Sequence, residues 1–283
     1  MKRNRKAKIL ATLGPKSSTS DIIEKLFLEG SDIFRLNFSH GSIEDHRKNC
    51  EIIRNLEKKY DHPICILADL QGPKLRVGDF VNKKEFLKKG QKFTFDLDNK
   101  PGNNLRVCLP HKEIFESLSA NTIILINDGK IKMQIIEQSE KKLIAEVLND
   151  GEISDNKGIN IPDAILPISS LTSKDESDLS KALEMGVDWI AQSFVQTVSD
   201  VKKLRKMVNK NTSIMAKIEK PSAVKNIEEI TEEADGIMIA RGDLGVELPP
   251  ENVPSIQKKI INRCRVKGKP VVVATQMLES MIN

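Results

Sequence analysis

The amino-acid sequence predicts an α/β protein: a TIM-type (β/α)8 barrel, incomplete at seven strands, with a small β-barrel domain inserted into it. Apolar strand-like runs alternate with helical spacing over residues 1–73 and again over residues 163–283, as expected where helices cover a parallel sheet. Between them, residues 74–162, here named the insertion, contain short alternating runs separated by Gly, Asn and charged turns. We therefore expect a discontinuous barrel domain that carries a β-rich lid.

Three strand-like runs and two helical spans precede the insertion. The runs cover residues 7–13, 32–39 and 64–70, and the helical spans end at Gly30 and Lys59. The second run alternates strictly, with Phe34, Leu36 and Phe38 on one face and Arg35, Asn37 and Ser39 on the other. We expect the apolar face to pack on the helices, and the polar residues late in the strand to face the mouth of the barrel.

Four strand-like runs and four helical spans follow the insertion. The runs cover residues 189–195, a segment ending at Glu219, 236–240 and 270–276, and the helical spans cover 172–183 with Ser173 as a cap, 198–208, 222–234 and 249–266. Three strands before the insertion and four after it make seven, whereas a closed barrel has eight. The sequence stops at Asn283, one strand short.

Composition narrows the class of partner. The 45 basic and 40 acidic residues are spread along the whole chain, which favours a mixed solvated surface over a nucleic-acid interface. One Trp and one Tyr make an aromatic platform for bases improbable. No long apolar stretch follows the basic opening residues, so we expect neither a signal peptide nor a membrane anchor. The four cysteines have no CxxC spacing, as expected for inert thiols in a reducing cytoplasm.

Three charged residues at the ends of two consecutive strand-like runs are the strongest candidates for chemistry. Lys217 and Glu219 are two apart and so share one face of a strand, and Asp243 follows the next run. Separately, Lys217 and Glu219 read equally well as a surface ion pair, and Asp243 as a residue that caps a turn. Together at strand ends they suit Mg²⁺ beside an anionic substrate. Gly242 and Asp243 also open a possible short helix, whose N–H groups favour an anion.

A second group of candidates is polar but less specific. On the 32–39 run, Arg35 can grip a phosphate with two hydrogen bonds, while Asn37 and Ser39 offer oxygens to a cation, although all three also suit a polar barrel layer. His40 is more often structural in such a place. Thr275 can donate a hydroxyl or merely fill space at the end of the last strand. Arg76 lies just past the start of the insertion, where it can move with that domain.

Five motifs in this order resemble the signatures of the pyruvate kinase family. They are RLNFSHG at 35–41, ADLQGPKLRVG at 68–78, AKIEKP at 216–221, IARGDLGVELP at 239–249 and ATQMLESM at 274–281. The resemblance runs from residue 7 to residue 283, with the insertion after the third barrel strand as in that family. It implies in-line transfer of the phosphoryl group of phosphoenolpyruvate to ADP, giving ATP and an enolate that is protonated to pyruvate, the last step of glycolysis.

The resemblance also implies residue roles. Lys217, Arg35 and Thr275 would be catalytic, and the substrate would meet Arg35, Lys217, Gly242, Asp243 and Thr275. Asn37, Phe38, Ser39, His40 and Arg76 would border the nucleotide. Glu219 and Asp243 would bind Mg²⁺, or Mn²⁺ in its place, and Asn37, Ser39, Asp69 and the Leu70 carbonyl would form a potassium site.

Three departures qualify these roles. Lys74 stands where potassium-dependent members have Glu, and Leu70 where they have Thr, so we hypothesise that the Lys74 ammonium replaces K⁺. Thr197 falls near the position of a nucleotide-binding lysine of many relatives. The family also continues through an eighth strand and a C-terminal domain that carries subunit contacts, usually of a homotetramer. We therefore expect two unpaired sheet edges here. Two alternatives stay open: a truncated, inactive chain that acts by association, and a different barrel that acts on phosphoenolpyruvate or a 2-oxo acid, such as an aldolase.

Overall fold

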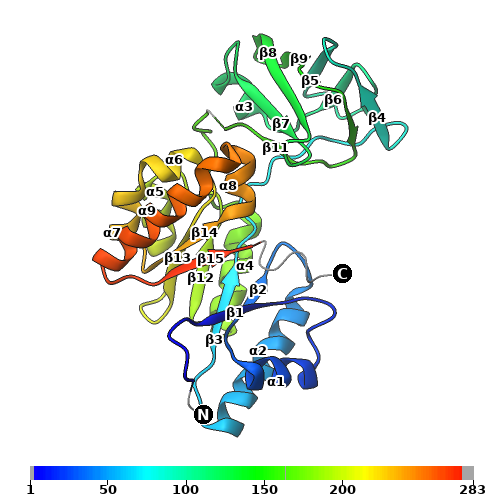
Figure 1. Cartoon of the computed structure of the whole chain (residues 1–283). Helices are drawn as coiled ribbons and strands as arrows, with labels where there is room; N and C mark the ends of the chain where they lie inside the picture. Colours follow the sequence, from blue (N-terminus) through cyan, green and yellow to red (C-terminus); the bar gives the residue numbers. More distant parts are fainter. Residues whose placement is uncertain (1–2, 163, 276–283) are drawn as a thin grey trace.

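The computed structural model describes residues 3–162 and 164–275, and Figure 1 shows a curved parallel sheet with helices outside it and a separate β structure above it. The strands of the curved sheet are β1 (Ile9–Leu13), β2 (Ser31–Asn37), β3 (Cys65–Asp69), β12 (Trp189–Gln192), β13 (Ser213–Ile218), β14 (Gly236–Ala240) and β15 (Val271–Ala274). They pair in parallel in that order, so the incomplete barrel of seven strands is confirmed. Within the described residues, β1 and β15 each pair on one side only.

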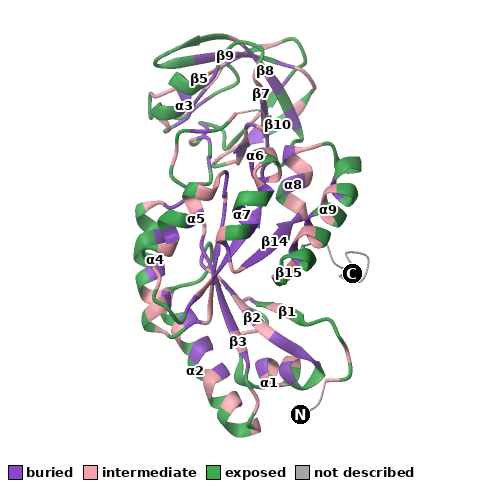
Figure 2. Ribbon diagram, turned by 90° about the vertical axis from the view of Figure 1, so that its left-hand side faces the viewer, coloured by how far each residue is buried: buried purple, intermediate pink, exposed green. Residues whose placement is uncertain are grey.

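The helices largely follow the predicted spans. They are α1 (Ser20–Glu29), α2 (Ile43–Tyr60), α4 (Ser173–Glu184), α5 (Val198–Arg205), α6 (Pro221–Lys225), α7 (Ile227–Glu233), α8 (Arg241–Glu247), the 3₁₀ turn η1 (Pro250–Asn252) and α9 (Val253–Val266). The short helix predicted around Gly242 and Asp243 is therefore confirmed, as α8. Figure 2 shows the outward faces of α1, α2 and α4 exposed and the strands mostly buried.

Three local predictions are wrong. The cap of α4 is Thr172, not Ser173, because Thr172 and Asp175 exchange backbone and side-chain hydrogen bonds in a capping box. The span 222–234 is two helices, since Asn226 leaves the helical conformation (φ −96°, ψ 16°) and its amide donates to the Gln196 carbonyl. The strand predicted to reach residue 195 ends at Gln192, because Phe194 adopts a left-handed backbone with φ 55°.

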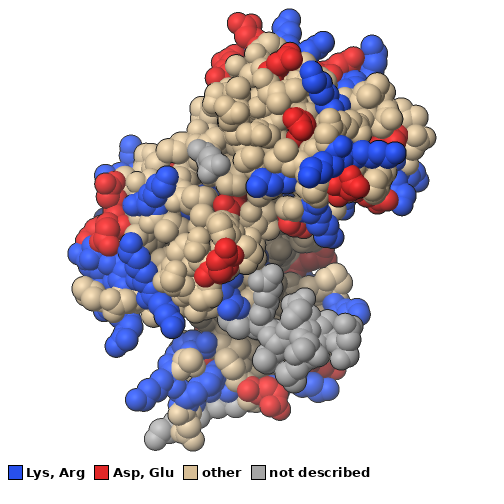
Figure 3. Space-filling view, turned by 45° about the horizontal axis from the view of Figure 1, so that its top comes forward, with Lys and Arg blue, Asp and Glu red and all other residues tan. Residues whose placement is uncertain are grey.

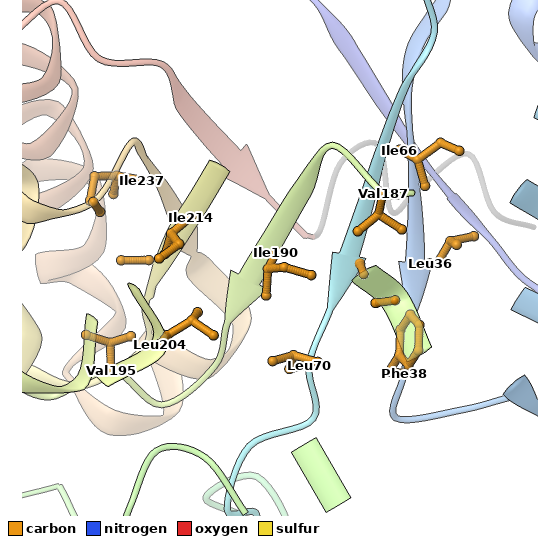
Figure 4. Packing of buried hydrophobic residues seen from close by; sticks show 14 of the residues in the cluster. Leu36, Phe38, Ile66, Leu70, Val187, Ile190, Val195, Leu204, Ile214 and Ile237 are labelled. Carbon is orange, nitrogen blue, oxygen red and sulfur yellow. The ribbon is translucent and has the colours of Figure 1, made fainter. Parts of the chain in front are cut away.

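The main core lies between the sheet and the helices. Phe34, Leu36 and Phe38 are buried there, so the predicted packing of the apolar face of β2 is confirmed. In Figure 4, Leu36 and Phe38 lie beside Ile66 and Leu70 of the neighbouring segment. Burying a side chain of this size contributes roughly 1.5–3 kcal/mol. Their burial fixes the register of β2, and with it the direction of the alternate residue Arg35.

The insertion folds around a core of its own. Its elements are β4 (Lys84–Leu87), β5 (Lys92–Asp96), β6 (Arg106–Cys108), α3 (Lys112–Ser117), β7 (Ile123–Ile126), β8 (Ile131–Ser139), β9 (Lys142–Val147), β10 (Gly151–Ser154) and β11 (Ile159–Asn160). They form a six-stranded sheet in the order β11-β7-β8-β9-β5-β6 and a two-stranded sheet of β10 and β4. Phe93, Phe95 and Phe115 are fully buried within it, and Leu166 of the returning chain joins this core. The boundaries at residues 73/74 and 162/163 stay predictions.

Two surface properties bear on partners. On the face drawn in Figure 3, basic and acidic side chains are interspersed over both the insertion and the barrel. In the part of the chain that the structure describes, no helix is both long enough and apolar enough to span a lipid bilayer.

Candidate active site

Polar side chains converge where β2, β3 and β13 end, at one edge of the curved sheet. The parallel register sets Asn37 beside Asp69, and parallel strands bring their last inward residues together at one edge. Asp69 lies between two cations. Its Oδ1 is 3.1 Å from Lys217 Nζ, and its Oδ2 is 2.6 Å from Arg35 Nε.

Lys217 is the centre of this cluster. Its Nζ donates to Ser193 Oγ at 2.7 Å and lies 2.9 Å from Glu219 Oε1. Burial lowers the pKa of Lys217, but the charges of Asp69 and Glu219 raise it more, so the net pKa lies above its usual value. Lys217 is therefore a fixed ammonium. We name Asp69, Ser193, Lys217 and Glu219 the floor of the site.

Glu219 is buried and anchored at both oxygens. While Oε1 faces Lys217, Oε2 accepts the Phe194 N–H at 2.8 Å. Burial raises the pKa of Glu219, Lys217 opposes this, and the negative charge of Asp243 raises it further. The two carboxylates are therefore close enough to interact. The left-handed backbone of Phe194 directs its N–H to Glu219, and its ring fills the space where a Cβ on Gly72 would lie, 2.6 Å from Phe194 Cδ2.

Asp243 differs from Glu219 in exposure. It stands in the first turn of α8, exposed, and makes no hydrogen bond or ion pair with any residue in 3–162 or 164–275. Next to it, the Gly242 N–H donates to Thr275 Oγ1 at 3.0 Å, and Thr275 has a left-handed φ of 66°. The α8 start, Thr275 and the floor thus share one region.

The donor set fits a hard divalent cation. Glu219 and Asp243 offer carboxylate oxygens, one held rigidly and one without a partner among the described residues. Mg²⁺ usually takes one or two carboxylates and completes its octahedron with water and substrate phosphate, and Mn²⁺ accepts the same ligands. Within the described residues, no cluster of three or more His, Cys, Asp or Glu side chains forms a complete metal cage. Two carboxylates suit an ion that is shared with a substrate.

A cavity of about 850 Å³ adjoins the floor on the inner face of the sheet. Arg35, Lys217, Asp243 and Thr275 line its polar end. Arg35 also donates to Thr12 Oγ1 at 3.0 Å, which together with Asp69 fixes the guanidinium. Because Arg35 lines a space of ligand size, it can bind a phosphate or carboxylate there.

The residues predicted to border a nucleotide lie in two places. Asn37 is the last residue of β2, and Ser39 and the exposed His40 follow it. The Phe38 ring, in contrast, is buried and stacks on His46 at 4.3 Å between ring centroids. The Phe38 side chain is therefore a packing residue. Arg76 is exposed on the insertion, and its guanidinium donates to the Asn156 carbonyl at 2.8 Å.

The predicted potassium ligands are only partly available. Asp69 is engaged by Arg35 and Lys217, and the Leu70 carbonyl accepts Ser193 Oγ at 2.7 Å. The Asn37 side-chain oxygen accepts the Ser39 N–H at 3.2 Å. Lys74 is exposed and lines a different cavity, beside Phe194 and Asp243, without an ion pair in the described part of the chain. The exposed residues His40, Lys74, Arg76 and Asp243 are here named the rim of the site.

Sequence reasoning missed several residues of the site. Ser193 accepts from Lys217, and Phe194 orients Glu219, but both lie in a run read as continuous strand. The signal that could have found Ser193 is its position as a polar residue after the apolar part of that run. Lys174 donates to the Phe38 carbonyl at 2.9 Å from a helix 136 residues away, and no local pattern signals that contact. Of the last motif, Gln276 and the residues after it lie outside the described residues.

Comparisons with known proteins agree on one family. The family described as "Pyruvate kinase, barrel domain" matches residues 4–283. Pyruvate kinases from Agrobacterium vitis and Methylorubrum extorquens are 49% and 51% identical, over 100% of this chain and 59% of each relative. A crystal structure of a pyruvate kinase from Cryptosporidium parvum superposes with a TM-score of 0.94 at 36% identity, over 98% of this chain and 59% of that chain. The chain therefore spans less than two thirds of the length of these proteins.

Proposed function

The chain belongs to the pyruvate kinase family, and we propose that it performs the phosphoryl transfer from phosphoenolpyruvate to ADP that yields pyruvate and ATP. One observation carries the proposal: a buried ammonium, Lys217, lies within 3.1 Å of two carboxylates at the ends of parallel strands, beside a third at Asp243. With Arg35 and a divalent cation bound by the carboxylates, the Lys217 ammonium would supply positive charge where a phosphoryl group in transit carries negative charge.

Each group has a proposed task. Arg35 binds the phosphate of phosphoenolpyruvate, held in direction by Asp69 and Thr12. The Lys217 ammonium stabilises the phosphoryl group as it passes in line between the enolate oxygen and the ADP oxygen. Gly242 and Thr275 at the start of α8 contact the substrate. Glu219 and Asp243 would hold Mg²⁺ or Mn²⁺, which supplies further neutralisation of phosphate charge when bound.

The nucleotide is proposed to lie between the end of β2 and the insertion. Asn37, Ser39 and His40 offer polar groups on one side, and Arg76 offers a guanidinium on the other. The Phe38 contribution is then through its backbone, since its ring is buried. A cytoplasmic location is part of the same proposal.

Potassium independence is a further part of the proposal. Lys74 is exposed, and its ammonium makes no ion pair within the described ranges. It is thus available to supply the positive charge that K⁺ gives in potassium-dependent members. Turnover should be equal within about twofold in potassium and in a bulky organic cation, because the protein carries its own cation. A large potassium stimulation contradicts this.

A coupled pyruvate assay of the 283-residue chain tests the function directly. Turnover is expected with Mg²⁺, phosphoenolpyruvate and ADP. Chelation of the metal is expected to abolish it. The alternative, an inactive chain that acts by association, would use the edges that β1 and β15 leave unpaired among the described residues, and it predicts no turnover. Absence of any turnover in a folded, Mg²⁺-loaded sample contradicts the proposed function.

A further inference from the structure

A polar side-chain contact joins the insertion to the barrel. Among residues 3–162 and 164–275, the only side-chain hydrogen bond or ion pair between the insertion and the barrel joins Asn160 to Glu247. Asn160 Nδ2 donates to Glu247 Oε1 at 2.7 Å. Asn160 belongs to β11, at the end of the insertion, and Glu247 is the last residue of α8. Figure 1 shows β11 directly above α8.

Glu247 is also tied to the floor of the site. Lys220 Nζ lies 3.5 Å from the same oxygen, Glu247 Oε1, and both side chains are buried. Lys220 directly follows Glu219 in the chain. One carboxylate oxygen therefore receives a donor from the insertion and a cation from the segment that carries a proposed metal ligand.

The helix between these contacts leads to the other proposed metal ligand. α8 has seven residues, so it is about 10 Å long at 1.5 Å per residue. Asp243 is near its start and Glu247 at its end. The β7–β8 turn approaches the same end, since a Cβ built on Gly129 would lie 3.9 Å from Val246 Cγ1. A displacement of the insertion therefore acts on one end of the helix that carries Asp243.

Stability alone does not explain this arrangement. Glu247 Oε2 is buried and has no hydrogen-bond partner among the described residues. A buried ion pair with an unmatched oxygen is poor stabilisation compared with an apolar packing of the same volume. Buried polar groups of this kind can instead select one geometry out of several.

We propose that Glu247 is a positioning residue: through Asn160 it sets the orientation of the insertion over the site, and through Lys220 and α8 it couples that orientation to Glu219 and Asp243. The catalytic consequence rests on the proposed function, because it assumes that the insertion closes over the nucleotide. The structural consequence, a defined orientation of the insertion, does not depend on any activity.

A distance measurement tests the structural part. Spin labels on Lys141→Cys in the insertion and Lys206→Cys on the barrel occupy exposed positions. Of the native thiols, Cys50, Cys108 and Cys264 are buried, and burial raises the pKa of Cys65 to about 12, so that its thiol stays protonated during labelling. We expect a narrow distance distribution in the parent protein and a broad one in Asn160→Ala.

Two further variants separate positioning from general loosening. Asn82→Ala removes a matched bond within the insertion, from Asn82 Nδ2 to Glu85 Oε1 at 2.9 Å, and should leave the distribution narrow. Asn160→Asp sets two carboxylates against each other and should broaden it. The double variant Asn160→Asp with Glu247→Gln exchanges donor and acceptor and keeps one negative charge beside Lys220. It should make the distance distribution narrow again. A narrow distribution in Asn160→Ala, equal broadening in Asn82→Ala, or a folded double variant that stays broad would each overturn the proposal.

Kinetics test the catalytic part. If the insertion positions the nucleotide, Asn160→Ala should lower kcat/KM for ADP about tenfold and leave KM for phosphoenolpyruvate nearly unchanged. The double variant Asn160→Asp with Glu247→Gln should recover most of the lost kcat/KM for ADP, and Asn82→Ala should not lower it. A purely structural role would instead lower the active fraction, and with it kcat, and would leave KM for both substrates unchanged. If the parent shows no turnover, the proposed function fails, and the distance distributions still decide the positioning role.

Discussion

The floor and the rim of the site are built on opposite principles. On the floor, Lys217 and Glu219 are buried, and each has at least two polar partners within 3.1 Å. On the rim, Asp243 and Lys74 are exposed and have no ion pair in the described part of the chain. A preorganised floor needs no rearrangement when charge develops, whereas a free rim can take up ligands and ions. The site therefore separates the groups that must be fixed from those that must adapt.

Replacing the central ammonium of the floor should have the largest effect. Lys217→Met removes the cation from between Asp69 and Glu219. On the proposed mechanism the phosphoryl group then loses its main electrostatic partner, so we expect turnover to fall by at least about 10³-fold. The two carboxylates left without it should also lower the free energy of unfolding, by roughly 3–5 kcal/mol. Coupled assays and thermal unfolding measure both quantities.

The control for this variant is Lys206→Met, on an exposed lysine of the barrel. It should match the parent in both measurements. Proton exchange at the pyruvate methyl group should partly survive in Lys217→Met, since enolate formation does not require phosphoryl transfer. Unchanged turnover in Lys217→Met would remove the floor from the mechanism.

Neutralising the rim carboxylate Asp243 should lower turnover but leave the free energy of unfolding nearly unchanged. Asp243→Asn keeps the shape of the side chain but removes one of the two carboxylates proposed to bind the divalent ion, so we expect turnover to fall about 10²-fold and the required Mg²⁺ concentration to rise. The free energy of unfolding should stay within about 0.5 kcal/mol, because Asp243 is exposed. Glu251→Gln, another exposed acidic residue nearby, should change neither. A loss of stability comparable to that of Lys217→Met would erase the distinction between floor and rim.

A change behind the floor should have an intermediate effect. Gly72 has φ +71°, and an added Cβ would lie 2.6 Å from the Phe194 ring. Gly72→Ala should therefore destabilise the fold by about 1–3 kcal/mol and reduce turnover, because Phe194 must move and its N–H is the anchor of Glu219. Thermal unfolding and the coupled assay measure the two effects.

Gly90→Ala provides the matched comparison. Gly90 also has a positive φ, +81°, but nothing lies within 4 Å of an added Cβ. It should show the backbone penalty of about 1 kcal/mol and no change in turnover. If the two variants behave alike, the Phe194 contact does not position Glu219.

Features set by local sequence patterns could be predicted, whereas the bonds that fix the floor could not. The seven barrel strands and the faces of β2 follow from local patterns of apolar residues, so they were predictable. Lys217 and Glu219 were also found, because strand alternation places them on one face. The bonds that fix the floor come from Ser193 and Phe194, which depend on a left-handed turn that the apolar run conceals.

Contacts between residues far apart in the sequence could not be predicted. The Asn160–Glu247 bond joins residues 87 apart, and the Lys174 contact to the Phe38 carbonyl spans 136. Neither follows from periodicity, because each depends on how separately folded elements meet. The split at Asn226 is of the same kind, since its amide is satisfied by Gln196, in the loop after a different strand.

The smallest effect should come from the pH response of a buried histidine under the rim. His46 stacks on Phe38, and its Nε2 lies 3.1 Å from the carbonyl oxygen of the exposed rim residue His40. Burial lowers the pKa of His46, although the His40 carbonyl and the charges of Asp45 and Asp178 oppose this, and Lys174 lowers it further. The unfolded chain, with a pKa near about 6.5, then binds the proton more readily than the folded one.

The sign of the effect follows from that difference. Stability is fully present above about pH 6.5 and falls as the pH drops below it toward the lower folded pKa. His46→Gln keeps an amide donor for the His40 carbonyl but does not titrate. Its unfolding temperature should therefore change less than the parent's between pH 7.5 and 5.5, and the difference should correspond to up to about 1 kcal/mol in the free energy of unfolding. His40→Gln should keep the parent's pH response, because His40 is exposed. If His40→Gln flattened the response instead, the proton that matters would bind at the rim, and the burial of His46 would have no part in the acid sensitivity of this fold.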